Sequence, residues 1–445
     1  MGIRRRFGLM VTSVATVPLV LAGCTAPTSK TEDRADPAAA AAQRAPAPTL
    51  ALAPANDARD VPISTEISTG VRDGKVTGIK VTDASGAEVA GSPRPDDPGT
   101  WVPEKPLKNK ETYRVEVTAA NDAGGSTTGT SSFTTMDKSN RARTTSTLYF
   151  GENRTYGAAM PVTVAFDPPV PEESRADVQR RLYVRTEPSQ PGTWSWLPDG
   201  SQVAYRAPDF WQEGTTISVR SALDGVPIGK NRIGDTDRSA SSKIGEEVTM
   251  VVDNAAKTMA VYRGGKLERE MPVSLGKPST PSSSGNMVVM EKHEQTVFDT
   301  RGEPNGGYVV TVQDAQRLTW GGEFIHSAPW SVSDQGVRNV SHGCANLSPA
   351  NANWLMGISK VGDLVTVKGT EVRLENGNGW TAWNQSWDDF AAGSALPVPE
   401  NLAPTRSIDP ASPPPQQPGA PASPGPQPSG APEEGSSGRD SGSGG

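Results

Sequence analysis

Short runs in which hydrophobic and polar residues alternate fill most of the chain between residues 49 and 245. They include VTGIKVTD and TYRVEVTAAN in the first half of this region, and PVTVAFDPPV, RLYVRTE and TTISVRS in the second. Turns rich in Asp, Gly and Pro separate the runs. Alternation with a period of two predicts strands that bury one face, and many short strands at regular spacing favour β-sandwiches. The polar stretch PEESRADVQRRL interrupts the second half and predicts a short helix.

Residues 246–369 carry a denser set of strand patterns. NMVVMEK, GYVVTVQ, EFIHS and DLVTVKG each predict a strand, and Ser348 followed by Pro349 predicts the N-terminus of one helix. The region opens with a predicted hairpin whose turns are Asp253-Asn254 and Gly264-Gly265. Its apolar positions are Val248, Met250, Val252, Met259, Val261 and Leu267. This pattern predicts a β-rich domain with a single helix near its end.

A tryptophan-rich segment, residues 370–398, follows this domain. Trp383, Trp387 and Phe390 have the spacing of one helical face, which predicts a helical flap packed on the third domain. Sugar stacking is the alternative use of these rings, and core packing is favoured. The predicted fold class is mainly β: two immunoglobulin-like β-sandwich domains (49–137 and 146–245), the β-rich third domain with a short helix after Cys344, and this small C-terminal subdomain.

Both ends of the chain have a composition that excludes a packed core. Residues 399–445 are rich in Pro, Gly and Ser, and residues 24–48 are rich in Ala, Pro and charged groups, so we expect a disordered tail and a disordered tether. The two immunoglobulin-like domains are then expected to act as spacers rather than as wall-binding modules.

The first 23 residues have the layout of an export signal. Three arginines, Arg4 to Arg6, precede an apolar run from Phe7 to Ala22 that is short for a membrane span. The run ends in Leu-Ala-Gly-Cys, which resembles a bacterial lipobox and implies cleavage before Cys24 and attachment of acyl chains to Cys24. A plain cleavage site is the alternative. The resemblance predicts a lipoprotein anchored to the extracytoplasmic face of the cell membrane.

Charge and cysteine content narrow the chemistry. The net charge of −7 gives no general attraction to nucleic acid, and no nucleic-acid partner is expected. The chain has two cysteines and three histidines. With Cys24 used by lipid, Cys344 is the remaining thiol and has no internal disulfide partner.

Cys344 lies in the stretch SHGCAN, which offers what a nucleophilic cysteine needs. A base must take the thiol proton, and backbone N–H groups must stabilise the oxyanion. The N–H groups of Gly343 and Cys344 are the candidate oxyanion donors. His326, His342 and His293 are the candidate bases, and His326 is favoured because a long loop folds its strand back toward Cys344. The carbonyl of Ser327 is the expected group that orients its ring.

Three other functions of these residues are considered as alternatives. His326, His342 and Cys344 are admissible zinc ligands, although a fourth is not evident, so no metal is predicted. A papain-like or NlpC-type peptidase also uses Cys and His, but there the cysteine usually precedes the histidine. A non-catalytic wall-binding lipoprotein would use Cys344 only for packing.

His326, a spaced loop and then Ser341-His342-Gly343-Cys344-Ala345-Asn346 together resemble the signature of the L,D-transpeptidases with a YkuD-type catalytic domain. The resemblance extends over HSAPWS, SHGCANLSPANANW and MPVSLGKPSTPSSSG. It implies Cys344 as nucleophile, His326 as proton acceptor and donor, and Ser327 as orienter, with Ser341 and His342 as supporting motif residues. The resemblance also implies substrate contacts from Tyr308, Gly321, Gly322 and Asn346.

The implied activity is the formation of 3→3 cross-links between peptidoglycan stem peptides, with no cofactor. Hydrolysis of the same stems, an L,D-carboxypeptidase activity, is the alternative, and β-lactams of the carbapenem class are implied as covalent inhibitors. The chain departs from the family pattern in two places. The flap before Tyr308 is short and lacks an extra tyrosine, and DGVPIGKNR carries Pro227 and Lys230 where some relatives have acidic residues that bind a divalent ion.

Overall fold

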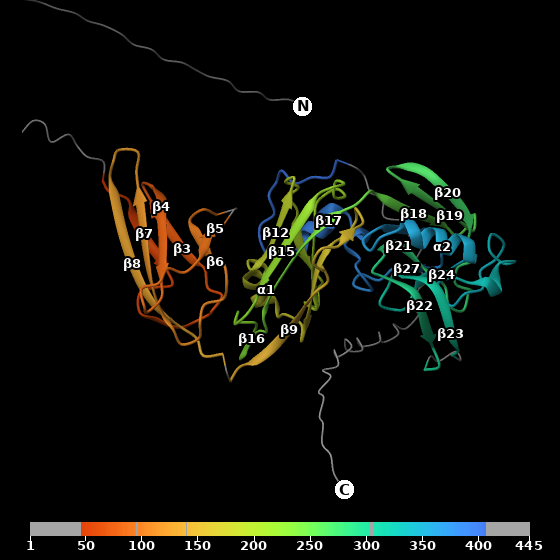
Figure 1. The fold of residues 1–445 in the computed structure, drawn as a ribbon, viewed down its shortest axis with the longest axis horizontal. Helices are drawn as coiled ribbons and strands as arrows, with labels where there is room; N and C mark the ends of the chain where they lie inside the picture. The colour runs from red at the N-terminus through yellow and green to blue at the C-terminus, as the bar shows by residue number, and fades with distance from the viewer. Residues whose placement is uncertain (1–45, 95–96, 139, 303–306, 406–445) are drawn as a thin grey trace, which may run out of the picture. The chain divides into compact units, whose positions relative to one another are not determined.

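The computed structural model describes residues 46–94, 97–138, 140–302 and 307–405 (Figure 1). The predicted signal segment, Cys24, most of the tether and the tail beyond residue 405 lie outside the described residues. No helix in the described part is long and apolar enough to cross a membrane.

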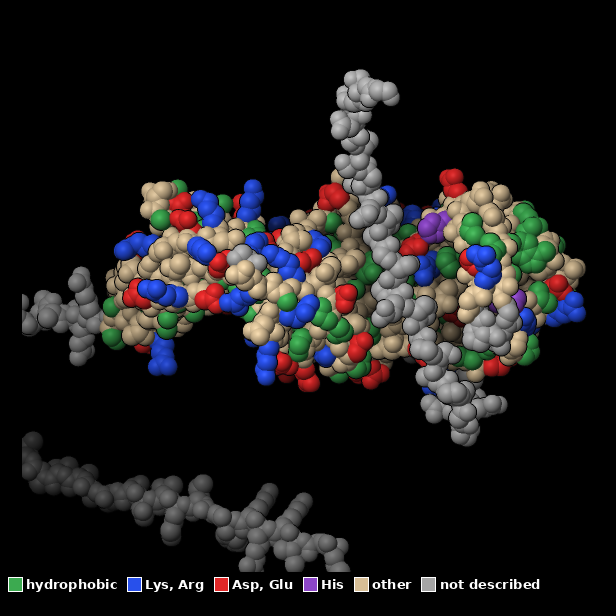
Figure 2. Space-filling view, turned by 90° about the horizontal axis from the view of Figure 1, so that it is seen from below, with side chains coloured by type: hydrophobic (Ala, Val, Ile, Leu, Met, Phe, Trp, Pro, Cys, Tyr) green, Lys and Arg blue, Asp and Glu red, His purple; other side chains and the backbone are tan. Residues whose placement is uncertain are grey.

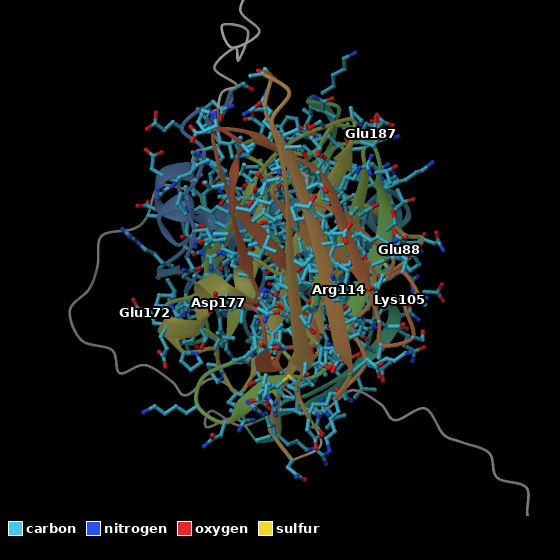
Figure 3. The ribbon with its side chains drawn as sticks, turned by 90° about the vertical axis from the view of Figure 1, so that its left-hand side faces the viewer. Glu88, Lys105, Arg114, Glu172, Asp177 and Glu187 are labelled. Carbon is cyan, nitrogen blue, oxygen red and sulfur yellow. The ribbon has the colours of Figure 1, made fainter. Side chains whose placement is uncertain are left out.

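The first domain consists of two four-stranded sheets (orange in Figure 1). In β7 (Thr112–Ala120) buried Tyr113, Val115 and Val117 alternate with exposed residues, as the sequence pattern predicts. Arg114 of this strand, labelled in Figure 3, is one of the exposed residues. One sheet has the order β1 (Thr49–Ala53), β3 (Ile67–Arg72), β6 (Thr100–Pro103), β5 (Gly91–Pro93); the other has the order β2 (Ala58–Val61), β8 (Ser126–Thr135), β7, β4 (Lys75–Thr82).

The second domain is also a pair of sheets, and it contains the predicted short helix, α1 (Glu172–Gln179). Figure 3 shows Glu172 and Asp177 of α1 pointing outward, while Val178 is buried. One sheet has the order β10 (Thr155–Tyr156), β17 (Asp237–Ile244), β15 (Thr216–Ala222), β12 (Leu182–Glu187). The other has the order β13 (Thr193–Trp196), β14 (Gln202–Arg206), β11 (Val162–Asp167), β9 (Ala142–Leu148), β16 (Arg232–Gly234).

The third domain packs a six-stranded and a four-stranded sheet with the helix α2 (Pro349–Ile358). The larger sheet has the order β20 (Lys266–Pro272), β19 (Thr258–Arg263), β18 (Val248–Asp253), β26 (Leu364–Lys368), β21 (Ser283–Val288), β27 (Val372–Arg373). The smaller sheet has the order β22 (Glu291–Asp299), β23 (Val309–Arg317), β24 (Phe324–Ser327), β25 (Ala345–Leu347), with the short 3₁₀ turn η1 (Pro329–Ser331) after β24.

Local signals in this domain act as the sequence predicts, with one exception. The Ser348 hydroxyl accepts a hydrogen bond from the backbone N–H of Asn351 and so caps α2. Met250, Met259 and Val261 are fully buried, but Leu267 is 57% exposed. Leu267 departs from the alternation of the other apolar positions because the register shifts between Val261 and Tyr262, where an irregularity interrupts the β19–β20 pairing.

The aromatic rings of the tryptophan-rich segment are buried, but the segment is not one helix. Trp383 belongs to the 3₁₀ turn η2 (Ala382–Asn384), whereas Trp387 and Phe390 lie on α3 (Trp387–Ala392). The prediction of a single helical face is therefore wrong, while the prediction of core packing is confirmed, since these rings are at most 9% exposed. Ser386 caps α3 and separates it from η2, which explains the break.

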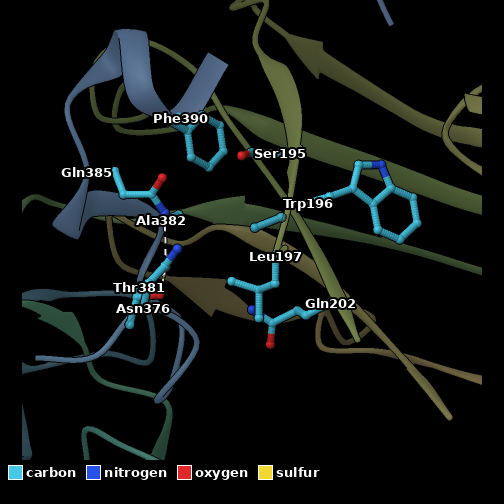
Figure 4. A pocket seen from close by; sticks show the side chains of 10 residues that line it. Ser195, Trp196, Leu197, Gln202, Asn376, Thr381, Ala382, Gln385 and Phe390 are labelled. Atoms are coloured by element: carbon cyan, nitrogen blue, oxygen red, sulfur yellow. Dashed lines mark hydrogen bonds between the residues drawn. The ribbon is translucent and has the colours of Figure 1, made fainter. Parts of the chain in front are cut away.

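The same segment packs on the second domain as well as on the third. The Arg206 guanidinium of β14 lies 4.3 Å from the ring centroid of Trp383 and 4.5 Å from that of Phe390, and it donates to the Ala382 carbonyl. Figure 4 shows the small pocket beside this contact, where Ser195 of β13 points toward Phe390 and the Trp196 ring points away from it. The expectation of packing on the third domain alone is thus too narrow.

Charged side chains of both signs are interspersed on the surface seen in Figure 2. In Figure 3, Glu88 and Lys105 of the first domain likewise project outward. These surfaces show alternating charge rather than a broad field of one sign.

Asp363, in the turn before β26, is fully buried, and its carboxyl makes the stability of the protein depend on pH. Its Oδ2 accepts from the Lys360 N–H at 2.6 Å, while its Oδ1 has no partner among the described residues. Burial raises the pKa of Asp363 to about 7, against the opposing effect of Lys360 and Lys292. As pH rises, the Asp363 carboxyl therefore loses its proton in the unfolded chain at a lower pH than in the folded protein. The free energy of unfolding falls as pH rises from about 4 through 7.

Asp363→Asn is expected to remove this loss. At about 1.4 kcal/mol per pKa unit, the variant should gain a few kcal/mol of unfolding free energy over the wild type at pH 8, and no comparable gain at pH 4. Thermal unfolding of both proteins across this range measures the difference. A difference that does not change with pH would contradict this assignment.

Candidate active site

A parallel pair of strands brings the two central residues of the sequence motif together. In the β24–β25 register, Ile325 lies opposite Ala345 and His326 opposite Asn346. Ile325 and Ala345 point into the hydrophobic core. Side chains alternate across a sheet, so His326 and Asn346 share the opposite face, and Cys344, two positions before Asn346, enters on that same face.

The register also sets the spacing of Cys344 and His326. Strands lie about 4.8 Å apart and rise about 3.3 Å per residue, so these diagonal neighbours have Cα atoms about 8 Å apart. A thiol and an imidazole side chain directed at one another span that separation. The long connection from 328 to 344, which includes η1, is what allows two strands in parallel to be neighbours.

The His326 imidazole is buried, 3% exposed, and its ring is oriented by its own strand. Nδ1 lies 2.9 Å from the Ser327 carbonyl oxygen. A carbonyl only accepts, so Nδ1 carries the proton in this contact and Nε2 is left with its lone pair. The rings of Phe298 and Trp330 flank the imidazole at 5.3 and 6.0 Å. Burial lowers the pKa of His326, although the Ser327 hydrogen bond opposes this, so the ring is neutral near pH 7.

Cys344 is 7% exposed and its thiol donates to the Gly322 carbonyl at 3.7 Å. The peptide around it is held on several sides. The Ser341 hydroxyl donates to the Cys344 carbonyl at 2.6 Å and accepts from the Gly343 N–H at 3.2 Å. The Ser282 hydroxyl donates to the Gly343 carbonyl at 2.6 Å. The loop therefore presents a fixed sulfur on the face of the sheet that also carries a neutral imidazole, which is an arrangement suited to acyl transfer by a cysteine.

Comparisons with known proteins show the family of the chain. Residues 247–367 match the model of the L,D-transpeptidase catalytic domain, and residues 58–227 match a bacterial Ig domain. L,D-transpeptidase 2 of Mycobacterium tuberculosis is 31% identical over 357 residues, which cover 78% of this chain and 85% of that protein. The chain belongs to the L,D-transpeptidase family. L,D-transpeptidase 5 of the same species is 31% identical over 407 residues, covering 89% of this chain and 86% of the relative.

Solved L,D-transpeptidases are also similar to the chain. One, determined in complex with imipenem, has a TM-score of 0.41 at 34% identity, covering 50% of this chain and 97% of the other. Another, from Mycobacterium smegmatis, has a TM-score of 0.39 at 35% identity with the same coverage. The family match confirms the expected family, the mainly β fold class and the L,D-transpeptidase function.

The four predicted substrate-contact residues of this L,D-transpeptidase have different partners, and one of them contacts the sulfur. Gly322 contacts the Cys344 thiol directly, and the Gly321 N–H donates to Asn378 Oδ1 at 2.7 Å. Tyr308 is half-buried directly before β23, with its ring 5.0 Å from that of His342. Asn346 is 2% exposed, and its Nδ2 donates to the Ser331 hydroxyl of η1. The substrate roles of these four residues stay predictions.

The other two histidines of the L,D-transpeptidase have different partners. His342 Nε2 lies 2.8 Å from Lys277 Nζ, and an ammonium group only donates, so Nε2 accepts there. His293 lies on β22, where its Nε2 contacts Glu291 Oε2 at 3.0 Å. The residues that the structure describes contain no group of three or more His, Cys, Asp and Glu side chains spaced to hold a metal ion.

Sequence reasoning missed three residues at this site: Lys277, Ser282 and Glu323. Glu323 lies beside Gly343, its Oε1 accepts from the Ser283 N–H at 2.7 Å, and its Oε2 is buried without a partner in the described residues. Burial raises the pKa of the Glu323 carboxyl. Lys277 and Ser282 lie inside MPVSLGKPSTPSSSG. This stretch is part of the family resemblance, but nothing in the sequence distinguishes these two positions from their neighbours.

Proposed function

We propose that the chain cross-links peptidoglycan stem peptides through a thioester on Cys344. The observation that carries the proposal is the β24–β25 register, which sets Cys344 and the neutral His326 on one face of the sheet. In the first step His326 Nε2 accepts the thiol proton. The thiolate attacks the carbonyl between the L-centre of the third stem residue and the D-Ala at position four.

Collapse of the resulting tetrahedral intermediate breaks the carbon–nitrogen bond. The leaving D-Ala amine takes the proton from the His326 imidazolium, and the stem remains on Cys344 as a thioester. The backbone N–H groups of Cys344 and Gly343 are our candidate donors to the oxyanion. The Gly343 N–H contact to Ser341 Oγ, at 3.2 Å, is long, so its exchange for an oxyanion costs little.

The second step returns the enzyme to its starting state. The side-chain amine of a diamino acid on a neighbouring stem loses a proton to His326 and attacks the thioester, which gives a 3→3 cross-link. Water in place of this amine would give the L,D-carboxypeptidase activity. These two acyl transfers need only a nucleophile, a base and oxyanion donors.

Incubation of the protein with a disaccharide-tetrapeptide, followed by mass analysis, tests the proposal. The expected products are a cross-linked dimer and free D-Ala. If tripeptide is the only product, the activity is that of an L,D-carboxypeptidase. If the tetrapeptide is unchanged, the protein is better explained as a non-catalytic wall-binding lipoprotein. A carbapenem is expected to leave an adduct on Cys344, since its strained amide carbonyl presents the same acyl centre to the thiolate.

We further propose that lipid on Cys24 anchors the protein to the extracytoplasmic face of the cell membrane. The motif Leu21-Ala22-Gly23-Cys24 after an apolar run supports this. Two acyl chains, each contributing about 0.8 kcal/mol per buried CH₂, are sufficient for stable anchoring. Mass spectrometry of the mature N-terminus should find an acylated Cys24, and an unmodified later residue at that end would contradict it.

A further inference from the structure

Ser282 lies directly before β21 and reaches the loop that carries the nucleophile. It is 4% exposed, its Oγ accepts from the Gly276 N–H at 2.9 Å, and it lies 2.6 Å from the Gly343 carbonyl oxygen. A backbone N–H only donates and a carbonyl only accepts. The Ser282 hydroxyl hydrogen is therefore directed at the Gly343 oxygen.

Because of peptide geometry, this bond also determines where the Cys344 N–H points. The Gly343 carbonyl and the Cys344 N–H belong to one planar, trans peptide, so they point in opposite directions. Fixing the oxygen fixes the N–H. Gly343 has φ of +119°, a conformation that glycine adopts freely but that it also leaves freely. The Ser282 hydrogen bond comes from outside the loop and restricts the orientation of the peptide after Gly343.

The Ser341 hydroxyl holds the two neighbouring peptides. Ser341 Oγ bonds to the Gly343 N–H, which belongs to the preceding peptide, and to the Cys344 carbonyl, which belongs to the following one. Ser282 itself is held firmly, because the adjacent Ser283 N–H donates to Glu323 Oε1 and the Glu323 side chain packs beside Gly343. The start of β21 and the nucleophile loop are therefore joined on two sides.

We propose that Ser282 is a positioning residue for acyl transfer, which aims the Cys344 N–H at the developing oxyanion and strengthens it as a donor. A carbonyl that accepts a hydrogen bond polarises its own peptide, and its N–H then donates more strongly. Ser282 does not touch the substrate in this role. The inference rests on the proposed function, since it requires Cys344 to be the attacking group.

Ser282→Ala separates this role from simple support of the loop. Acyl transfer to Cys344 builds an oxyanion, whereas alkylation of its thiol by iodoacetamide displaces iodide and builds none. Loss of a whole oxyanion donor costs on the order of 10²–10³ in rate. In Ser282→Ala the Cys344 N–H is still present but its direction is no longer fixed, so kcat/KM for the tetrapeptide should fall by roughly 10 to 100-fold. The alkylation rate should stay within about twofold of the wild type.

Thr280→Val is the matched control. Thr280 Oγ1 makes only a 3.4 Å contact to the Ser341 carbonyl, which already accepts from the Lys277 N–H at 2.9 Å, so both rates should be unchanged. If Ser282→Ala keeps its kcat/KM, or if turnover and alkylation fall together, the inference is wrong. Either result leaves the proposed function intact as long as Cys344→Ala is inactive. Turnover by Cys344→Ala would instead overturn the proposed function.

Discussion

Replacing Cys344 by serine should lower turnover of a disaccharide-tetrapeptide by at least about 10³-fold. The substitution keeps the size of the side chain and its contact with the Gly322 carbonyl, but an alcohol is far less acidic than a thiol. Neutral His326 can draw a proton from a thiol near pH 7 but not efficiently from a hydroxyl. Turnover assays, with mass analysis for an acyl adduct on the protein, measure the loss.

Cys24→Ser provides the matched control, because it removes the other cysteine. Its turnover of a soluble muropeptide should equal that of the wild type, while its mature N-terminus should lack lipid. The thermal unfolding temperature of Cys344→Ser should stay close to the wild-type value, since one buried atom is exchanged. Substantial turnover by Cys344→Ser would remove the thioester step from the mechanism.

His326→Ala should slow both turnover and alkylation of Cys344 near neutral pH. General-base assistance is commonly worth 10² to 10⁴-fold, and we expect a turnover loss in that range. The two proteins should also differ in how the alkylation rate changes with pH. In the wild type the rate falls only below the lowered pKa of His326, where the ring becomes protonated and cannot accept the thiol proton. Without the ring, the alkylation rate should instead keep rising with pH as hydroxide produces the thiolate.

His293→Gln is the control for this experiment, because His293 contacts Glu291 on β22 and has no part in the proposed steps. It should retain the wild-type rates and pH profile. If His326→Ala alkylated with an unchanged profile, the base would have to be sought elsewhere in the loop.

Much of the fold could be predicted because its signals are local. Alternation in β7 depends on neighbouring residues only, and so does the cap that Ser348 gives to α2. The arrangement of the C-terminal segment was not predictable in the same way. The spacing of Trp383, Trp387 and Phe390 fits one helix, but Ser386 begins a new one, and the Arg206 contact comes from a strand some 180 positions earlier.

The centre of the site was also accessible from sequence, since Cys344 and His326 are rare residue types in a distinctive spacing. The Ser327 contact of the His326 ring follows from adjacency in the chain. Ser282 is different. It is one of three successive serines, and its partner Gly343 lies 61 positions away, so no local pattern distinguishes it from Ser283 or Ser284.

The parallel pairing of β24 and β25 has a consequence for insertions and deletions. Between residues 328 and 340 the chain runs through a loop, where extra residues leave the phase of both strands unchanged. A single residue added between Cys344 and Asn346 would reverse the phase, turning the sulfur toward the packed interior and a core residue toward the substrate. Insertions and deletions should therefore be tolerated between residues 328 and 340, whereas a change of length between Cys344 and Asn346 should abolish activity.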